Sequence, residues 1–142
     1  MSPQEADCIF CQIVAGRIPS ARIHEDDQVL AFLDIGPLQP GHTLVIPKAH
    51  HERLTDMPPE AMAALGSVLP VVARAVMEVT QAEGFNVFQT NGACAGQVVG
   101  HVHFHVIPRR SDDGLGFRWK PGTYGEGEME VLRRRIAAAL GS

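Results

Sequence analysis

The sequence lacks the features of an exported or membrane-spanning protein. Segment 1–7 is polar and acidic, without the basic start and apolar stretch of a signal peptide. No uninterrupted run of about 18 apolar residues occurs, so we expect no membrane span. Three cysteines in 142 residues do not make a secreted disulfide framework. These absences predict a cytoplasmic protein that has no membrane partner.

Basic residues are too few for a protein that binds a nucleic-acid polymer. The chain has 12 Lys and Arg against 16 Asp and Glu, which gives a formal net charge of −4. Duplex-binding proteins depend on basic patches for their affinity, so this balance argues against a polymer and leaves a single nucleotide as a ligand. The other composition values, 45% hydrophobic and 20% charged, are typical of a globular chain of one domain.

Strand-like and helix-like segments predict an α+β fold. Apolar or alternating segments at 21–25, 29–35, 42–46, 85–90 and 101–107 predict five strands, and the third and fifth are expected to stop at a proline. The order of elements predicts an antiparallel five-stranded sheet with one long helix and one or two shorter helices on one side of it.

The long helix is expected to begin after Asp56, which is its candidate cap, and to kink at Pro70. Its apolar residues repeat at steps of three and four, which places them on one buried face. These residues are Met62, Leu65, Leu69, Val72, Val76 and Val79. A second helix is expected over about 126–140, with Leu132, Ile136 and Leu140 on one side and an arginine run at 133–135 facing solvent.

Three of the seven histidines lie within five residues, at His101, His103 and His105. Side chains alternate along a strand, so the expected strand 101–107 places all three on one face and the apolar residues between them on the core face. Three interpretations are open: solvated histidines, metal ligands that include His103 and His105, and nucleophilic catalysis at phosphorus. In the third, one neutral imidazole attacks phosphorus and a neighbouring imidazole assists the leaving group.

The motifs resemble those of the histidine-triad (HIT) superfamily of nucleotidyl hydrolases and transferases. The segment His101-Val-His103-Phe-His105-Val-Ile is similar to the H-φ-H-φ-H-φ-φ motif of that superfamily, where φ is an apolar residue. Further similar segments follow the family order over 8–109; they are Cys8-Ile-Phe-Cys11-Gln-Ile13, Phe32-Leu-Asp34-Ile, Gly41-His42-Thr-Leu-Val-Ile-Pro-Lys48-Ala-His50 and Gly96-Gln97. The similarity is greatest to bacterial Hint-like and HIT-family hydrolases.

The resemblance implies a single HIT domain over 1–142, with a motif core at about 8–109 and a variable tail with a helix at 110–142. It also implies a homodimer and a nucleotide substrate such as an AMP derivative. The activity would be hydrolysis or transfer at the α-phosphate of a nucleoside 5′-monophosphate derivative through a covalent nucleotidyl-histidine. An AMP-amidate, a dinucleoside polyphosphate or a nucleotide adduct would be the substrate. A nucleotide-binding interaction protein with little turnover and a metal-dependent hydrolase remain as alternatives.

The resemblance also implies site residues. The nucleophile would be His103, His105 would act on the phosphate and leaving group, and Gln97 would complete the catalytic set. The residues implied to bind substrate are Asn91, Asp34, His42, Phe10, Ile13, Phe32, Ile35 and Val98. Many Hint-like sequences have Ser or Thr where this chain has Val98, so the phosphate would have one hydroxyl donor fewer.

The pair Cys8-x-x-Cys11, with His50 and His101 downstream, supplies two thiolates and two imidazoles, the ligands of a tetrahedral structural zinc site. A redox pair and two free thiols are the alternatives. By the spacing of the family, His50 is preferred to His51 as the fourth ligand. We therefore expect a structural zinc ion bound by Cys8, Cys11, His50 and His101.

Overall fold

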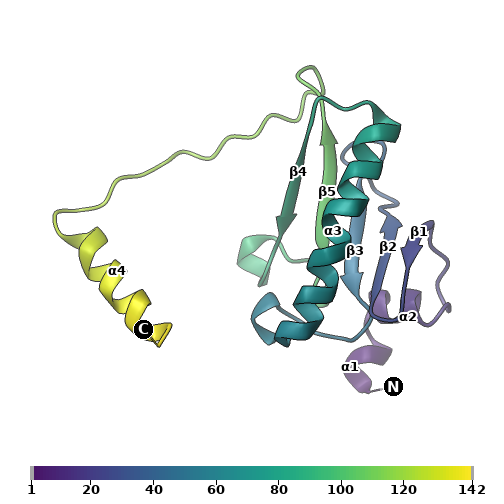
Figure 1. The fold of residues 1–142 in the computed structure, drawn as a ribbon, viewed down its shortest axis with the longest axis horizontal. Helices are drawn as coiled ribbons and strands as arrows, with labels where there is room; N and C mark the ends of the chain where they lie inside the picture. Colours follow the sequence, from purple (N-terminus) through teal and green to yellow (C-terminus); the bar gives the residue numbers. More distant parts are fainter. Residues whose placement is uncertain (1, 142) are drawn as a thin grey trace.

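The computed structural model describes residues 2–141, and its centre is a five-stranded antiparallel sheet (Figure 1). The strands are β1 (Arg22–Glu25), β2 (Val29–Leu33), β3 (Thr43–Pro47), β4 (Gly84–Gln89) and β5 (Phe104–Arg109), in the order β1-β2-β3-β5-β4. The helices are α1 (Pro3–Ala6), α2 (Ile9–Val14), α3 (Pro59–Thr80) and α4 (Glu128–Ala139), with 3₁₀ turns η1 (Leu54–Asp56) and η2 (Ala93–Ala95). The predicted α+β class and five strands are confirmed.

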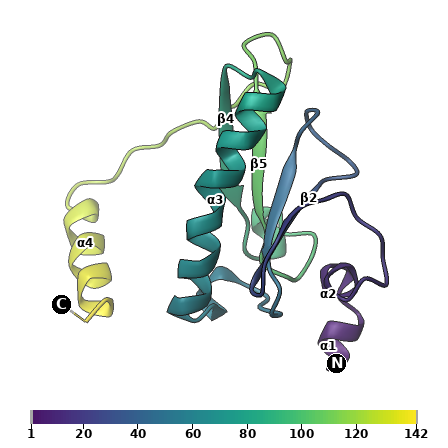
Figure 2. The same ribbon diagram turned by 45° about the vertical axis from the view of Figure 1, so that its right-hand side comes forward.

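Both faces of the sheet are covered, although the sequence pattern predicted helices on one side only. The residues of β2 and β3 alternate between two apolar clusters: Val29 and Val45 pack with α3, and Leu30 and Ile46 pack with α2. Figure 2 shows α2 and α3 on opposite sides of the sheet. The reason is that β2 and β3 are apolar on both faces, so each face needs a covering element.

Helix α3 differs from its sequence prediction at both ends. Its N-cap is Pro58, while Asp56 lies in η1 and accepts a hydrogen bond from the backbone N–H of Arg53. Pro70 lies inside the helix as predicted. Val79, predicted to be buried, is 82% exposed, because the apolar pattern continues past the part of the helix that lies on the sheet. Among the predicted apolar residues, the buried ones are Leu65, Val72 and Val76.

By length and composition alone, α3 could cross a membrane, which the sequence analysis did not expect. The same is true of the core helix of many soluble proteins. In this structure one face of α3 packs on the sheet, while Val71, which is not among the packed residues, is 55% exposed.

Strand β5 begins three residues later than predicted. Only His105 of the three clustered histidines lies in it, because the pairing with β3 ends at Val45 opposite Phe104. The N–H of Val102 instead donates to the carbonyl of His51. At its other end β5 continues through Pro108, which pairs only with Phe85 of β4 and therefore loses no bond on its open side. Likewise β3 includes Pro47 at its end.

Gly41 fixes the turn that leads into β3. Its φ is +97°, and a Cβ atom there would lie 2.7 Å from the Cγ2 atom of Thr80. Any side chain would therefore meet both a strained backbone and the end of α3. The absence of a side chain at Gly41 therefore lets the turn lie close to the end of α3, and His42 follows this turn directly before β3.

The tail after β5 leaves the body of the protein. Residues 110–127 contain no helix or strand, and they lead to α4, which lies apart from the sheet (Figure 1). The predicted second helix is thus present, two residues shorter at its start and one at its end than the 126–140 expected from sequence.

Candidate active site

The orientation of His103 suits a nucleophile. Its Nδ1 atom lies 2.7 Å from the backbone oxygen of His101, so Nδ1 carries the proton and donates it to that carbonyl. In the neutral ring, Nε2 then has a free electron pair. The side chain is 6% exposed, and the ring of Phe10 packs edge-on against it with a centroid distance of 5.0 Å.

A hydrogen-bonded chain fixes the proton of His105. The backbone N–H of Leu38 donates to Nδ1 of His42 over 3.1 Å, so a neutral His42 carries its proton on Nε2. That Nε2 lies 2.9 Å from Nδ1 of His105 and donates to it. The proton of His105 is therefore on Nε2. The ring of Phe88 stacks on His105 at a centroid distance of 4.4 Å and holds its plane.

Burial keeps these histidines neutral. It lowers the pKa of His42, and the carboxylate of Asp34 offsets this only in part. It also lowers the pKa of His103, and the hydrogen bond to the carbonyl of His101 and the carboxylate of Asp34 offset this only in part. The pKa of His105 is lowered to about 4 by burial and by its neighbours His103 and His42. At pH 7 the site thus presents one imidazole nitrogen as an electron-pair donor and another as a hydrogen-bond donor.

The rings of His103 and His105 lie edge to face, with an interplanar angle of 61°. The ring centroids of His103 and His105 are 5.0 Å apart, so both can contact one phosphate group. Asp34 is half-buried beside them, with Oδ2 at 3.7 Å from Nε2 of His42 and Oδ1 accepting from the N–H of Gly36.

Gln97 and Asn91 join the loops beside the histidines. Gln97 accepts from the N–H of Gly92 over 2.7 Å and donates to the carbonyls of Glu52 and Val99 over 2.7 and 3.0 Å. Both N–H bonds of its amide are thus used within the protein. The Oδ1 atom of Asn91 accepts from the N–H of Leu54 over 2.7 Å. These bonds tie the segment at 52–54 to the loop at 91–99.

The other residues implied to bind substrate fall into two groups. Phe10, Ile13 and Phe32 are buried in the cluster between α2 and the sheet. Ile35 and Val98 are 96% and 92% exposed, so their side chains lie in solvent and wall no closed pocket in this chain. Contact of any of the five with a nucleotide stays a prediction.

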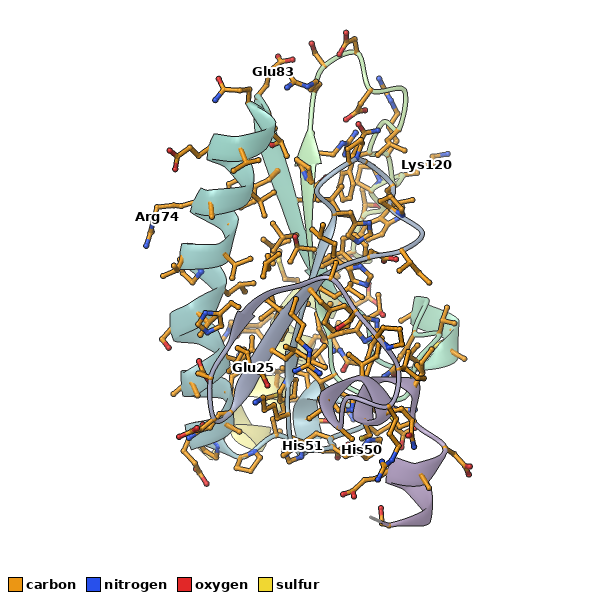
Figure 3. All side chains as sticks on the ribbon, turned by 90° about the vertical axis from the view of Figure 1, so that its right-hand side faces the viewer. Glu25, His50, His51, Arg74, Glu83 and Lys120 are labelled. Carbon is orange, nitrogen blue, oxygen red and sulfur yellow. The ribbon has the colours of Figure 1, made fainter. Side chains whose placement is uncertain are left out.

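The four predicted metal ligands lie close together, at the start of the histidine cluster 101–105. Their ligand atoms, the Sγ atoms of Cys8 and Cys11 and one ring nitrogen each of His50 and His101, lie within 4.8 Å of one another. Helix α2 sets the spacing, because the Sγ atom of Cys8 caps it by accepting from the N–H of Cys11. Figure 3 shows His50 beside α2.

The geometry of these atoms suits a tetrahedral ion. At a tetrahedral angle, zinc–ligand bonds of about 2.3 Å to sulfur and about 2.0 Å to nitrogen place S and N about 3.5 Å apart. The corresponding distances here are 3.4 Å from Cys8 to His101, 3.3 Å from Cys11 to His50 and 3.5 Å from Cys11 to His101. His101 donates from Nε2 to the carbonyl of Pro47 over 2.8 Å, which leaves Nδ1 free to bind a metal. Without a cation, burial and Cys8 raise the pKa of the Cys11 thiol to about 12.

Comparison with known proteins identifies the family. The model of the family described as "HIT domain" matches residues 15–112. The chain belongs to the HIT family. Two curated HIT relatives have hydrolase names. The adenylylsulfatase HINT3 of Arabidopsis thaliana is 43% identical over 80% of this chain, which spans only 58% of that relative's length. The adenosine 5′-monophosphoramidase hnt1 of Schizosaccharomyces pombe is 40% identical over 94% of this chain and 98% of its own.

Solved HIT structures share the fold. A HIT family protein from Bacillus subtilis is 42% identical, covers 93% of this chain and 96% of its own, and has a TM-score of 0.88. A histidine triad family protein from Mycobacterium smegmatis, described as Zn-bound, is 43% identical over 96% of this chain and 98% of its own. Its TM-score is 0.74.

Three contributors to the site were missed from the sequence. They are the N–H of Leu38, the carbonyl of Pro47 and the ring of Phe88. The first two are backbone groups, which residues of every type carry, so the residue type does not identify them. Phe88 stands opposite His105 in the β4–β5 register, and alternation within β4 could have identified it once that pairing was known.

Proposed function

We propose that this HIT protein hydrolyses nucleoside 5′-monophosphate derivatives, with His103 as nucleophile. The observation that carries the proposal is the hydrogen bond from Nδ1 of His103 to the carbonyl of His101, because it leaves Nε2 of His103 with a free electron pair. The neighbouring ring of His105 keeps its proton on Nε2. The hydrolase names of the two curated HIT relatives support the reaction class.

In the first step, Nε2 of His103 forms a bond to the α-phosphorus, and the bond from phosphorus to the leaving group breaks. The leaving group departs with the electron pair, and the N–H of His105 donates a hydrogen bond to it. The carbonyl of His101 then stabilises the positive charge of the substituted ring through the Nδ1 proton. In the second step, water attacks phosphorus and the electron pair of the nitrogen–phosphorus bond returns to Nε2. The attacking water releases one proton to solvent, which balances the proton that the departed leaving group takes up from solvent.

The substrate class is an adenylyl compound: an AMP-amidate, a dinucleoside polyphosphate or another nucleotide adduct. The carboxylate of Asp34, half-buried near the histidines, is the acceptor we assign to the ribose hydroxyls. Phe10 and Phe32 form the apolar surface we assign to the base, with Ile13 behind them.

The decisive experiment compares His103→Ala with His24→Ala, which removes an exposed histidine that is paired with Asp26 away from the site. With an AMP-amidate, His103→Ala should lose turnover and keep AMP binding, while His24→Ala should behave as wild type. Rapid quenching of the wild type should leave one nucleotide attached to His103. Normal turnover in His103→Ala would refute the mechanism. His105→Ala should impair poor leaving groups most.

We further propose that Cys8, Cys11, His50 and His101 hold one structural zinc ion. The convergence of the four ligand atoms and the Zn-bound relative support this assignment. When bound, zinc would connect α2 and its cap residue Cys8 to His101, which lies two residues before His103. Its role is structural, since the described chemistry at phosphorus needs no metal.

We also propose a homodimer of cytoplasmic chains, without a membrane or a nucleic-acid polymer as partner. Strand β4 is an edge of the sheet, with Phe85, Val87 and Phe88 between 38% and 46% exposed. Beside it, Leu69 and Met77 of α3 help to line an apolar groove of about 440 Å³. An exposed apolar edge of this kind favours pairing with a second copy.

A metal-dependent hydrolase is the second candidate function. The sequence analysis expected His103 and His105 as ligands, but the group that could hold an ion includes His105 and not His103. The ligand atoms of Asp34, His42 and His105 lie within 4.8 Å of one another, which would allow a second ion at the catalytic centre. Such an ion would replace the bond of 2.9 Å between His42 and His105. Mild chelation that abolishes turnover but leaves the fold intact would favour this candidate over the nucleophilic one.

A further inference from the structure

Arg53 is an exposed cation in the segment that precedes η1. Among the ion pairs of residues 2–141, none joins its guanidinium to a carboxylate. The carboxylate of Asp56 instead accepts from the backbone N–H of Arg53 over 3.1 Å. The positive charge of this side chain is therefore not neutralised within the described part of the chain, and its N–H donors can serve a ligand.

Hydrogen bonds on both sides of Arg53 fix its backbone beside the catalytic histidines. The carbonyl of His51 accepts from the N–H of Val102 over 2.8 Å, and Val102 directly precedes the proposed nucleophile. The N–H of Leu54 donates to Oδ1 of Asn91 over 2.7 Å. The position from which the side chain starts is thus set by contacts with the site, although its charged end is exposed.

The guanidinium of Arg53 lies against Gly92. Its Nη2, Cζ and Nη1 atoms are 3.6, 3.7 and 3.9 Å from the position that a Cβ atom of Gly92 would take. These similar distances show that a face of the planar group is turned to the glycine. The φ of Gly92 is +90°, which favours glycine, and the absent side chain leaves room for the guanidinium. The charge is therefore held over the loop at 91–99.

A short stretch of chain connects this loop to His105. The ring of Phe88 stacks on His105 at a centroid distance of 4.4 Å. The next residue, Gln89, donates from Nε2 to Oδ1 of Asn91 over 3.0 Å, and Gly92 follows directly. The guanidinium thus lies on the rim of the site that is continuous with His105, the residue that we assign to the leaving group.

The neighbouring side chains on this rim have few donors for a charged leaving group. His105 offers one N–H, on Nε2. Both N–H bonds of the Gln97 amide go to the carbonyls of Glu52 and Val99, over 2.7 and 3.0 Å. The side chain of Val98 has no donor at all. A leaving group with several anionic oxygens therefore has more acceptors than these residues can satisfy.

We propose that Arg53 is a specificity-determining residue, which favours leaving groups that carry anionic oxygens over uncharged amines. The inference rests on the proposed function and deepens it by naming the leaving group. When the bond from the α-phosphorus to a bridging oxygen breaks, the electron pair goes to the departing phosphate, which gains negative charge. Hydrogen bonds from a guanidinium to such oxygens are charge-assisted and stronger than those between neutral groups. An amine that departs uncharged gains no such stabilisation.

Turnover of two substrates by wild type, Arg53→Gln and Arg53→Lys tests this role. The substrates are diadenosine tetraphosphate, from which ATP departs, and adenosine 5′-phosphoramidate, from which ammonia departs. No divalent cation is added, because it would screen the polyphosphate. Arg53→Gln should lower kcat/KM for the tetraphosphate about tenfold and change that for the amidate less than about twofold. Arg53→Lys keeps the charge and should retain most of the wild-type preference.

Arg74→Gln is the matched control, because Arg74 is exposed and points away from α3 (Figure 3). It should leave kcat/KM for both substrates unchanged. Raising the salt concentration from about 0.05 M to about 0.5 M should lower kcat/KM for the tetraphosphate more in wild type than in Arg53→Gln, because salt screens an exposed charge. A purely structural role of Arg53 would not produce this difference.

The outcomes separate the inference from the proposed function. Equal losses of kcat/KM for both substrates in Arg53→Gln, or no loss for either, would overturn the role of Arg53 and leave the catalytic proposal intact. The same salt dependence in wild type and Arg53→Gln would also overturn it. A wild type that cleaves neither substrate would overturn the proposed hydrolysis, and the inference with it.

Discussion

Replacing Gln97 by Glu distinguishes a structural role of Gln97, in connecting the loops, from a role in binding the phosphate of the substrate. The Gln97 amide accepts one hydrogen bond and donates two, all to backbone groups, at 2.7, 2.7 and 3.0 Å. A net contribution of about 1 kcal/mol for each bond gives roughly 2–3 kcal/mol for their loss in Gln97→Ala. Gln97→Glu should cost at least as much, because its carboxylate would face the carbonyls of Glu52 and Val99 without a proton to donate.

The assay is urea unfolding of wild type, Gln97→Ala and Gln97→Glu, with Gln28→Glu as the control. Gln28 is exposed, so the same change of charge there should alter the free energy of unfolding by no more than about 0.5 kcal/mol. Turnover of an AMP-amidate is measured on the same samples. It should fall together with the stability, because the loop at 91–99 loses the hydrogen bonds of Gln97 to Gly92, Glu52 and Val99. Unchanged stability in Gln97→Glu with impaired turnover would refute the anchoring role and assign Gln97 to the substrate.

Three further predictions concern the metal, the pH dependence and the substrate. Metal analysis should find about one zinc per chain, and His50→Ala should lower both the zinc content and the melting temperature; a metal-free wild type with unchanged stability in chelator would contradict the site. Burial lowers the pKa of His105 to about 4, so between pH 6.5 and 4 the unfolded chain binds a proton that the folded chain does not. The free energy of unfolding in urea should therefore fall as the pH is lowered through that range, and less steeply in His105→Asn; equal slopes would exclude His105 as the cause. Val98→Ser should raise kcat/KM for an AMP-amidate, by roughly 10–150-fold if the hydroxyl bonds the phosphate in the transition state, and an equal or lower value would show that it does not.

Much of the site could be predicted from the sequence, because several of its residues lie close together in the chain. The clustered histidines and the pair Cys8-x-x-Cys11 stand close in the chain, and residue type alone indicates nucleophilic or metal-binding chemistry. The five strands were also predicted, since alternation and turn residues are local properties. Helix α2 was missed because it has six residues and its cap is Cys8, a residue type that does not usually mark a helix start.

The protonation pattern of the histidines was decided by tertiary structure. Three backbone groups fix it: the N–H of Leu38 and the carbonyls of Pro47 and His101. Which carbonyl or N–H meets a ring depends on strand register and on the course of the loops, and every residue type has the same backbone groups. A sequence therefore indicates that imidazoles are present but not which nitrogen carries the proton.

The sequence by itself determined the α+β class, the clustered histidines and the four candidate metal ligands, because these depend on residue type and short-range periodicity. Only the tertiary structure decided that β5 starts after His103, that Gln97 and Asn91 join the loops at 52–54 and 91–99, and that the apolar side of α4 lies away from its own body. The physical reason is that strand pairing and helix docking are set by contacts between distant segments. Periodicity shows that a helix has an apolar side, but not which surface covers it.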